Sequence, residues 1–278
     1  MNTTGSHRPK KRLGQNFLRD RAVLDKIVAA AELTPEDQVL EIGPGRGALT
    51  EVLAPHTTML VAVEIDRGLQ NHLMPLSNAH PHLDIRFQDF MKTEWAELGF
   101  VAERPVKVVA NIPYYITTPI LLKLLQAVRL EKEALSTVPP LAERILLMVQ
   151  WEVAKRLTAS PGNKDYGSLS IIAQYAAEVS IVTKVPAGAF YPRPEVDSAV
   201  VMLKPRTVAP VAIDDAAKLF RVVRGVFQQR RKTLQNGLLA AGFERPRLEA
   251  AVAATGLDLG RRAETLSLAE FAALANTL

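Results

Sequence analysis

Residues 39–53 read VLEIGPGRGALTEVL, which predicts a strand, a tight glycine turn and a helix in immediate succession. The first four residues have the length of a short buried strand. The glycines at 43, 45 and 47 let the backbone reverse and approach a ligand without a Cβ in the way. The helix that follows presents unpaired N–H groups at its start. This unit predicts a parallel sheet with a ligand site at the carboxyl ends of its strands.

The rest of the chain repeats this alternation of strand and helix. Further apolar runs lie near 59–63, 83–87, 106–110 and 144–149, with helical stretches between them, which is typical of a mainly parallel, doubly wound sheet. Two more β-rich runs, 169–175 and 198–203, are expected to complete the sheet as an antiparallel edge. A proline-containing segment at 205–210 then marks a boundary. After it, an Ala- and Leu-rich pattern predicts a small, all-helical C-terminal domain.

Polar residues follow three of the predicted strands. Glu64 ends the second strand, 19 residues after Gly45, and a carboxylate at this offset can accept both hydroxyl hydrogens of a ribose. Asp89 follows the third strand, where it can accept a hydrogen bond from an adenine amine. After the fourth strand comes the tetrapeptide NIPY, residues 111–114, which suits an amino group on a planar base. The Asn111 amide and the Ile112 carbonyl can accept its hydrogens, while Pro113 stiffens the turn and Tyr114 offers a face for stacking.

The glycines alone do not identify the ligand, because residues 43–48 also satisfy the G-x-G-x-x-G/A pattern of dinucleotide-binding proteins. Glu41 lies two residues before the first glycine, where a carboxylate would disfavour a pyrophosphate and suit the ammonium group of a methionine moiety. A nicotinamide enzyme also has no use for the NIPY turn. The acidic strand ends and this turn together favour S-adenosylmethionine.

With these features the chain resembles the ribosomal RNA adenine dimethyltransferase family, whose members dimethylate two adjacent adenosines near the 3′ end of small-subunit ribosomal RNA. The resemblance runs nearly end to end, and Trp151 departs from it because the family usually has Lys there. Six separated segments carry it in the family's order: LGQNFL (13–18), NIPYYITTP (111–119), YGSLS (166–170), FYPRPEVDS (190–198), RRKTLQN (230–236) and RAETLS (262–267).

The resemblance implies an α/β fold with the Rossmann-like sheet of class I methyltransferases. It implies that Tyr114 and Phe190 sandwich the target base, so that the expected catalytic residues are Asn111, Ile112, Pro113, Tyr114 and Phe190. The residues expected to bind S-adenosylmethionine are Asn16, Leu18, Gly43, Glu64, Asp89 and Asn111, together with Gly45 of the glycine turn.

Positive charge gathers at the two ends of the chain. The net charge is +5, yet residues 1–20 and residues 206–278 each carry +4, which leaves −3 for the part between them. Basic ends of this kind suit a phosphate backbone. The candidate RNA-binding residues are Lys10, Lys11 and Arg12 in an N-terminal arm, and Arg221, Arg224, Arg230, Arg231 and Lys232 on an expected helix.

The composition narrows the class of protein further. The chain has no Cys, and its five His show no paired ligand spacing, so we expect no metal. No run approaches the ~18 apolar residues of a membrane helix, and the basic N-terminus has no apolar signal core. We expect a cytoplasmic monomer with an arm at 1–20, a methyltransferase domain at 21–205 and a helical RNA-binding domain at 206–278.

The expected activity is dimethylation of the N6 amines of two adjacent adenosines in the 3′-terminal hairpin loop of 16S ribosomal RNA, with a role in small-subunit biogenesis. Two alternatives stay open. One is a 23S ribosomal RNA adenine methylase of the macrolide-resistance type, and the other is a non-catalytic ribosome-assembly factor that binds immature small subunits.

Overall fold

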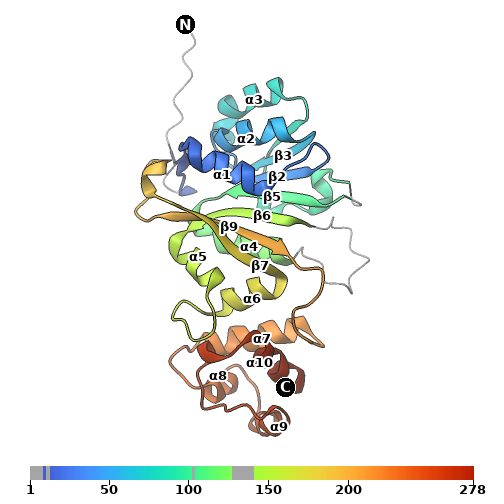
Figure 1. Ribbon diagram of the computed structural model, residues 1–278, viewed down its shortest axis with the longest axis vertical. Helices are drawn as coiled ribbons and strands as arrows, with labels where there is room; N and C mark the ends of the chain where they lie inside the picture. The colour runs from blue at the N-terminus through green and yellow to red at the C-terminus, as the bar shows by residue number, and fades with distance from the viewer. Residues whose placement is uncertain (1–8, 11–12, 102–103, 127–140) are drawn as a thin grey trace. The chain divides into compact units, whose positions relative to one another are not determined.

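A seven-stranded sheet is the main structural feature of the N-terminal part of the chain (Figure 1). The computed structural model describes residues 9–10, 13–101, 104–126 and 141–278. The strand order is β4-β3-β2-β5-β6-β9-β7, in which β2 to β6 pair in parallel and β9 is antiparallel to β6. The bounds are β2 (Gln38–Ile42), β3 (Met59–Glu64), β4 (Leu83–Phe87), β5 (Val106–Asn111), β6 (Leu141–Gln150), β7 (Ala177–Val185) and β9 (Ser198–Pro205). The predicted parallel strands and the strand at 198–203 are confirmed.

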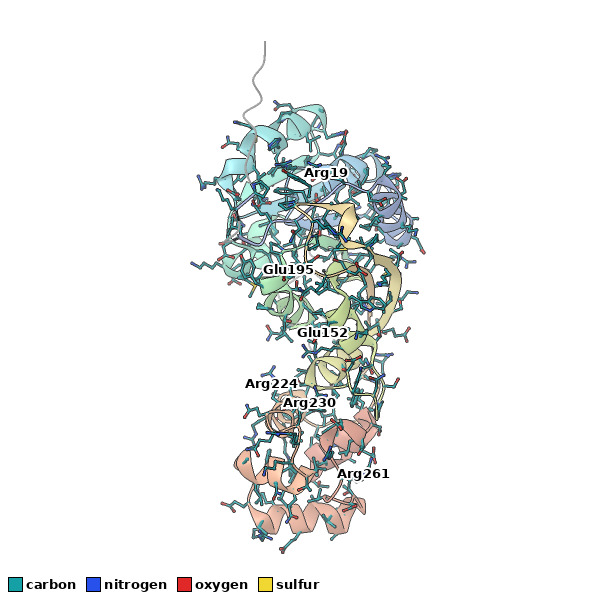
Figure 2. All side chains as sticks on the ribbon, turned by 90° about the vertical axis from the view of Figure 1, so that its left-hand side faces the viewer. Arg19, Glu152, Glu195, Arg224, Arg230 and Arg261 are labelled. Carbon is teal, nitrogen blue, oxygen red and sulfur yellow. The ribbon has the colours of Figure 1, made fainter. Side chains whose placement is uncertain are left out.

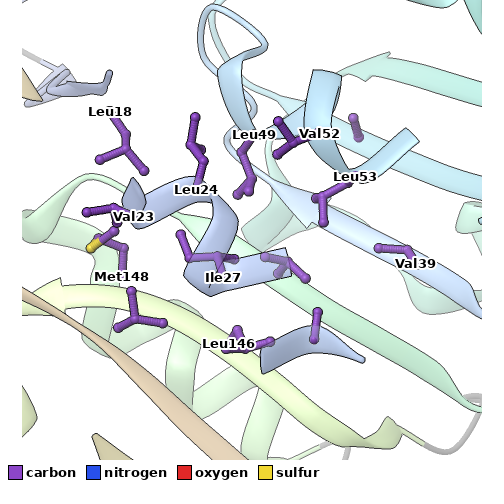
Figure 3. Packing of buried hydrophobic residues seen from close by; sticks show 14 of the residues in the cluster. Leu18, Val23, Leu24, Ile27, Val39, Leu49, Val52, Leu53, Leu146 and Met148 are labelled. Atoms are coloured by element: carbon purple, nitrogen blue, oxygen red, sulfur yellow. The ribbon is translucent and has the colours of Figure 1, made fainter. Parts of the chain in front are cut away.

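The central strands are buried on both faces, which explains their continuous apolar sequences. Val39, Val109 and Leu146 pack into one cluster with α1 (Arg21–Ala31) and α2 (Ala48–Leu53) (Figure 3). Alternate residues of the same strands, such as Leu40 and Val108, are also fully buried. Three more helices of the described chain accompany the sheet: α3 (Gln70–Ala79), α4 (Thr117–Gln126) and α5 (Trp151–Thr158).

One expected strand is a helix. Residues 169–175 lie in α6 (Ser168–Ala176), which is buried along nearly its whole length. The Ser170 hydroxyl stabilises the start of this helix, because it accepts a hydrogen bond from the Gly167 N–H at 3.0 Å and donates one to the Arg156 carbonyl. The edge of the sheet is instead β7, the strand that follows the helix directly. The prediction of a strand at 169–175 is therefore wrong.

A separate two-stranded ribbon joins two distant motifs of the sequence. Strand β1 (Phe17–Leu18) pairs antiparallel with β8 (Phe190–Tyr191), with Phe17 opposite Tyr191 and Leu18 opposite Phe190. The Arg19 N–H extends the ribbon by donating to the Ala189 carbonyl at 2.9 Å. The N-terminal motif is thereby held beside Phe190.

The chain divides into two compact units. The first contains Met1–Ala154 and Val179–Pro205, and the second contains Lys155–Glu178 and Arg206–Leu278. The expected boundary at residue 205 falls where the chain last enters the second unit, while residues 155–178, expected in the first domain, contribute to the second. The C-terminal helices are α7 (Ala216–Phe227), α8 (Leu234–Ala240), α9 (Arg245–Thr255) and α10 (Leu268–Thr277). Within the described residues, no helix combines the length and apolarity needed to cross a membrane.

Candidate active site

One pocket of the first unit lies where β2, β3, β4 and β5 end. All the residues expected to hold the cofactor or the target base line it: Asn16, Leu18, Gly43, Gly45, Glu64, Asp89, Asn111, Ile112, Pro113, Tyr114 and Phe190. The parallel strands explain this convergence, because their carboxyl ends meet at one edge of the sheet. The β1–β8 ribbon brings the remaining members, Asn16, Leu18 and Phe190, to the same edge.

The glycine turn after β2 forms one wall of the pocket and requires its glycines. Gly45 has φ +61° and Gly47 has φ +86°, a region that other residues rarely adopt. A Cβ on Gly45 would lie 3.0 Å from the Phe17 ring, and one on Gly47 would lie 2.3 Å from the Leu76 side chain. The turn is therefore packed tightly against β1 and α3, and its backbone stays close to the pocket.

Glu64 is held rigidly at the end of β3. Its Oε2 accepts a hydrogen bond from the Gly45 N–H at 3.0 Å, and its Oε1 accepts one from the Asp66 N–H at 2.8 Å. Burial raises the pKa of this carboxyl above its ordinary value, although the two N–H groups act against that rise. A carboxylate has about four acceptor positions. Glu64 therefore retains acceptor capacity for the two hydroxyl groups of a ribose.

Asp66, which the sequence did not single out, fastens the N-terminal segment beside the pocket. Its carboxylate accepts hydrogen bonds from the Lys10 ammonium at 2.5 Å and the Gln15 amide at 2.8 Å, and the Lys10 N–H donates to Gln15 Oε1. Lys10 was expected to bind RNA, yet here its ammonium contacts a nearly buried carboxylate. The other two arm residues, Lys11 and Arg12, lie outside the described residues.

Asp89 and Asn111 present free acceptors. Asp89 starts a short 3-10 helix, where its Oδ1 accepts a hydrogen bond from the Met91 N–H at 2.9 Å. Its Oδ2 has no hydrogen bond to the residues that the structure describes. The Asn111 side chain likewise makes no hydrogen bond within the described chain, although it lines the pocket. Both groups therefore remain available to a ligand, as binding of an adenine amine requires.

Two aromatic side chains lie near Asn111. Phe190 lines the pocket from β8 and is only 5% exposed. The Tyr114 hydroxyl forms a hydrogen bond with the fully buried Ser198 hydroxyl at 2.6 Å, which orients the tyrosine ring. Burial raises the pKa of Tyr114, so the phenol stays neutral. Ser198 belongs to the FYPRPEVDS motif, but nothing in the sequence indicated its contact with Tyr114.

The expected role of Glu41 requires correction. This side chain is fully buried and does not line the pocket, so it makes no direct contact with a ligand there. Burial raises its pKa to about 8, the interaction with Thr50 opposes that rise, and the negative charge of Glu64 adds to it. At neutral pH the group is mostly protonated. Its expected attraction for an ammonium group is therefore lost.

The basic candidates of the second unit are exposed, but they do not share a helix. Arg221 and Arg224 lie on α7, whereas Arg230, Arg231 and Lys232 lie in the turn that follows it, which corrects the expected helical placement. Arg230 donates hydrogen bonds to the carbonyls of Lys164 and Tyr166. Figure 2 labels Arg224 and Arg230. No group of three potential metal ligands occurs among the residues that the structure describes.

The fold and the pocket together define an S-adenosylmethionine-dependent methyltransferase with a Rossmann-like class I sheet. The sequence matches the model of the ribosomal RNA adenine dimethylase family over residues 6–278. The chain therefore belongs to that family.

Curated relatives and solved structures agree with this membership. The Ribosomal RNA small subunit methyltransferase A of Syntrophotalea carbinolica is 44% identical and covers 98% of both chains. That of Moorella thermoacetica is 45% identical over 97% of this chain and 92% of its own. A dimethyladenosine transferase from Plasmodium falciparum has a TM-score of 0.71 with 25% identity, covering 93% of this chain and 95% of its own. The 23S rRNA methyltransferase ErmE has a TM-score of 0.68 with 29% identity, covering 95% and 99% respectively.

Proposed function

We propose that this protein dimethylates the N6 amines of two adjacent adenosines in the 3′-terminal hairpin loop of 16S ribosomal RNA within the small ribosomal subunit. The single observation that carries the proposal is the presence of Asn111, Tyr114 and Phe190 in the same pocket as Glu64 and Asp89. One pocket thus offers groups for a target base and groups for an adenosyl cofactor. The names of the curated relatives support the small subunit as the substrate.

The residues present fit S-adenosylmethionine. Glu64 offers acceptors to a ribose, Asp89 offers a free oxygen to an adenine amine, and the glycine turn leaves its backbone close to the pocket. When bound, the cofactor supplies a methyl group on a sulfonium centre. Asn16, Leu18 and Gly43 are proposed to complete this part of the site.

The reaction requires the protein mainly to position the target amine. The adenosine leaves its stack and enters between Tyr114 and Phe190, where stacking on aromatic rings contributes ~1–3 kcal/mol per base. Asn111 Oδ1 and the Ile112 carbonyl accept the amine hydrogens and turn the nitrogen lone pair toward the methyl donor. Alignment of this kind can lower a barrier by roughly 7–11 kcal/mol.

Proton release after methyl transfer needs no side-chain base. The newly methylated amine is transiently cationic, and it is acidic enough to lose its proton to water. The monomethylated product still carries one N–H, which Asn111 or the Ile112 carbonyl can accept. This product must rotate in the pocket, or leave and return, before the second methyl transfer.

RNA binding is proposed to involve the basic residues of both units. Arg221, Arg224, Arg231 and Lys232 are exposed on the second unit, and we propose that this helical unit contacts phosphates. Arg230 is proposed to act with them from the turn after α7. We further propose that the protein acts as a monomer in the cytoplasm, where small subunits are assembled, and that it takes part in their maturation.

The proposed function is tested by incubating the protein with unmethylated small subunits and tritium-labelled S-adenosylmethionine. We expect label in 16S ribosomal RNA, and nucleoside analysis should yield N6,N6-dimethyladenosine. Large subunits serve as the comparison substrate, because the structural neighbour ErmE is a 23S rRNA methyltransferase. Label confined to 23S ribosomal RNA, or no label in a protein that binds small subunits, would contradict the proposal in favour of one of the two alternatives.

The replacement Glu64→Ala tests the ribose contact. Removing the carboxylate loses charged hydrogen bonds, each worth ~1.5–3 kcal/mol, so we expect the dissociation constant for S-adenosylmethionine to rise roughly 10- to 100-fold. Isothermal titration calorimetry measures this constant. Glu36→Ala removes an exposed carboxylate from the same unit and should leave it unchanged. Equal affinity in the Glu64 variant and the parent would refute the assignment.

A further inference from the structure

Two exposed side chains, Arg19 and Tyr191, form a stacked pair beside the pocket. The Arg19 guanidinium carbon lies 4.2 Å from the centre of the Tyr191 ring, within the range of a cation–π contact. Tyr191 is 48% exposed, whereas its neighbour Phe190 is 5% exposed. Phe190 lines the pocket, but neither Arg19 nor Tyr191 does. The pair is therefore adjacent to the site without being part of its wall.

The β1–β8 ribbon fixes the position of this pair. Tyr191 is opposite Phe17 in the ribbon, and the Arg19 N–H donates to the Ala189 carbonyl. Successive residues of a strand are roughly 3.4 Å apart. Their side chains point to opposite faces, so the Phe190 ring faces the pocket and the Tyr191 ring is exposed beside it. A nucleotide that neighbours the target in the RNA strand can reach it.

The charge on Arg19 is not neutralised by any carboxylate in the part of the chain that the structure describes. Among the described residues Arg19 has no carboxylate partner, whereas Arg21, two residues later, pairs with Asp25 at 3.0 Å. Figure 2 labels Arg19. An exposed guanidinium beside an exposed aromatic ring is the combination that binds single-stranded nucleic acid, because the ring stacks on a base and the cation attracts phosphate.

We propose that Arg19 and Tyr191 bind the nucleotide next to the target adenosine, with its base stacked on the Tyr191 ring and its phosphate against Arg19. A flipped-out base leaves its neighbour without a stacking partner, and this pair replaces that partner. The inference rests on the proposed function, since it requires an RNA substrate. It adds a contact outside the pocket that selects a single-stranded loop.

Substitutions at both positions test the proposal. Initial rates are measured against the concentration of unmethylated small subunits at saturating S-adenosylmethionine. We expect KM for the subunit to rise about tenfold in Tyr191→Ala and Tyr191→Leu, in line with the loss of one stacked base. Arg19→Ala loses the phosphate contact and should raise KM by about the same factor. Tyr191→Phe keeps the aromatic face and should stay within about twofold of the parent. Leucine has a similar apolar bulk but no such face, so it separates stacking from simple packing.

The controls exclude a structural effect. Arg21→Ala removes an exposed arginine close to Arg19 and should leave KM unchanged. The affinity for S-adenosylmethionine should match the parent in every variant, because neither Arg19 nor Tyr191 lines the pocket. The melting temperature should also match, because both side chains are exposed. Equal KM values for the leucine and phenylalanine variants, or a parental KM for Arg19→Ala, would overturn the proposal.

Failure of the proposed function is seen separately, in the parent protein. If the parent labels 23S rather than 16S ribosomal RNA, the proposed substrate is wrong. The ratio of each variant's KM to the parent's KM is then measured on large subunits, and it decides the role of Arg19 and Tyr191. If the parent labels no RNA, both proposals are wrong.

Discussion

Asn111→Ala is expected to reduce the rate of methyl transfer by roughly 10²- to 10³-fold, the loss typical when one preorganised hydrogen-bonding group is removed from a reacting centre. Asn111 ends β5 inside the pocket, and its side-chain amide has no hydrogen bond within the described chain. Removing that amide therefore costs little in folding. It takes away an acceptor that holds the target amine, so the effect should appear in kcat rather than in KM for the subunit.

The measurement is single-turnover tritium transfer to unmethylated small subunits, with subunit binding followed in parallel by filter retention. Asn111→Asp keeps an acceptor oxygen and should retain more activity than the alanine variant. Asn78→Ala, an exposed change on α3, is the matched control and should behave like the parent. Subunit binding should survive in all three variants. Unchanged transfer in Asn111→Ala would contradict the assigned role.

Most of the sheet was predictable because parallel strands have a clear sequence signal. The central strands β2, β3 and β5 are buried along nearly their whole length, which produces mainly apolar runs, and β3 and β5 end at the polar site residues Glu64 and Asn111. The pocket followed from the same signal, since Glu64, Asp89 and Asn111 were placed by the strand ends. The contacts between distant segments had no such signal. Ser198 against Tyr114, and Asp66 against Lys10, depend on tertiary packing alone.

The error at residues 169–175 has a physical cause. The sequence LSIIAQY is mostly apolar and is interrupted only by Ser170 and Gln174. Over seven residues, a buried helix and a buried strand cannot be distinguished by hydrophobic pattern. The segment that does form the edge, Ala177–Val185, carries Glu178, Ser180 and Lys184, so it lacks a continuous apolar run. Its β-branched residues were the available signal, because they favour strands. The turn at 230–232 was missed because a run of basic residues is compatible with either a helix or a turn.

Glu41→Gln is expected to change how the stability of the protein depends on pH. Glu41 is fully buried, neither carboxyl oxygen has a hydrogen bond to the described residues, and burial raises its pKa from 4.5 to about 8. The folded protein therefore holds this proton more tightly than the unfolded chain. In the parent, the contribution of Glu41 to the free energy of unfolding is fully present below about pH 4.5. It is lost as the pH rises to about 8, and the total loss is ~3–5 kcal/mol.

Glutamine has nearly the same shape and cannot ionise, so the variant should lose this part of the pH dependence. Urea unfolding at pH 5.5, 7 and 8.5 measures this pH dependence. The free energy of unfolding of the variant, minus that of the parent, should increase with each increase in pH. Titrating groups that do not interact with Glu41 are present in both proteins and cancel in the comparison. The charge of Glu64 contributes to the raised pKa of Glu41, so its effect is part of the difference that is measured. Glu51→Gln, an exposed change on the same α2 helix that carries Thr50, should give a curve parallel to the parent. A Glu41→Gln curve that is also parallel to the parent would mean that Glu41 is ionised in the folded protein, and it would contradict the prediction that this buried carboxyl is protonated.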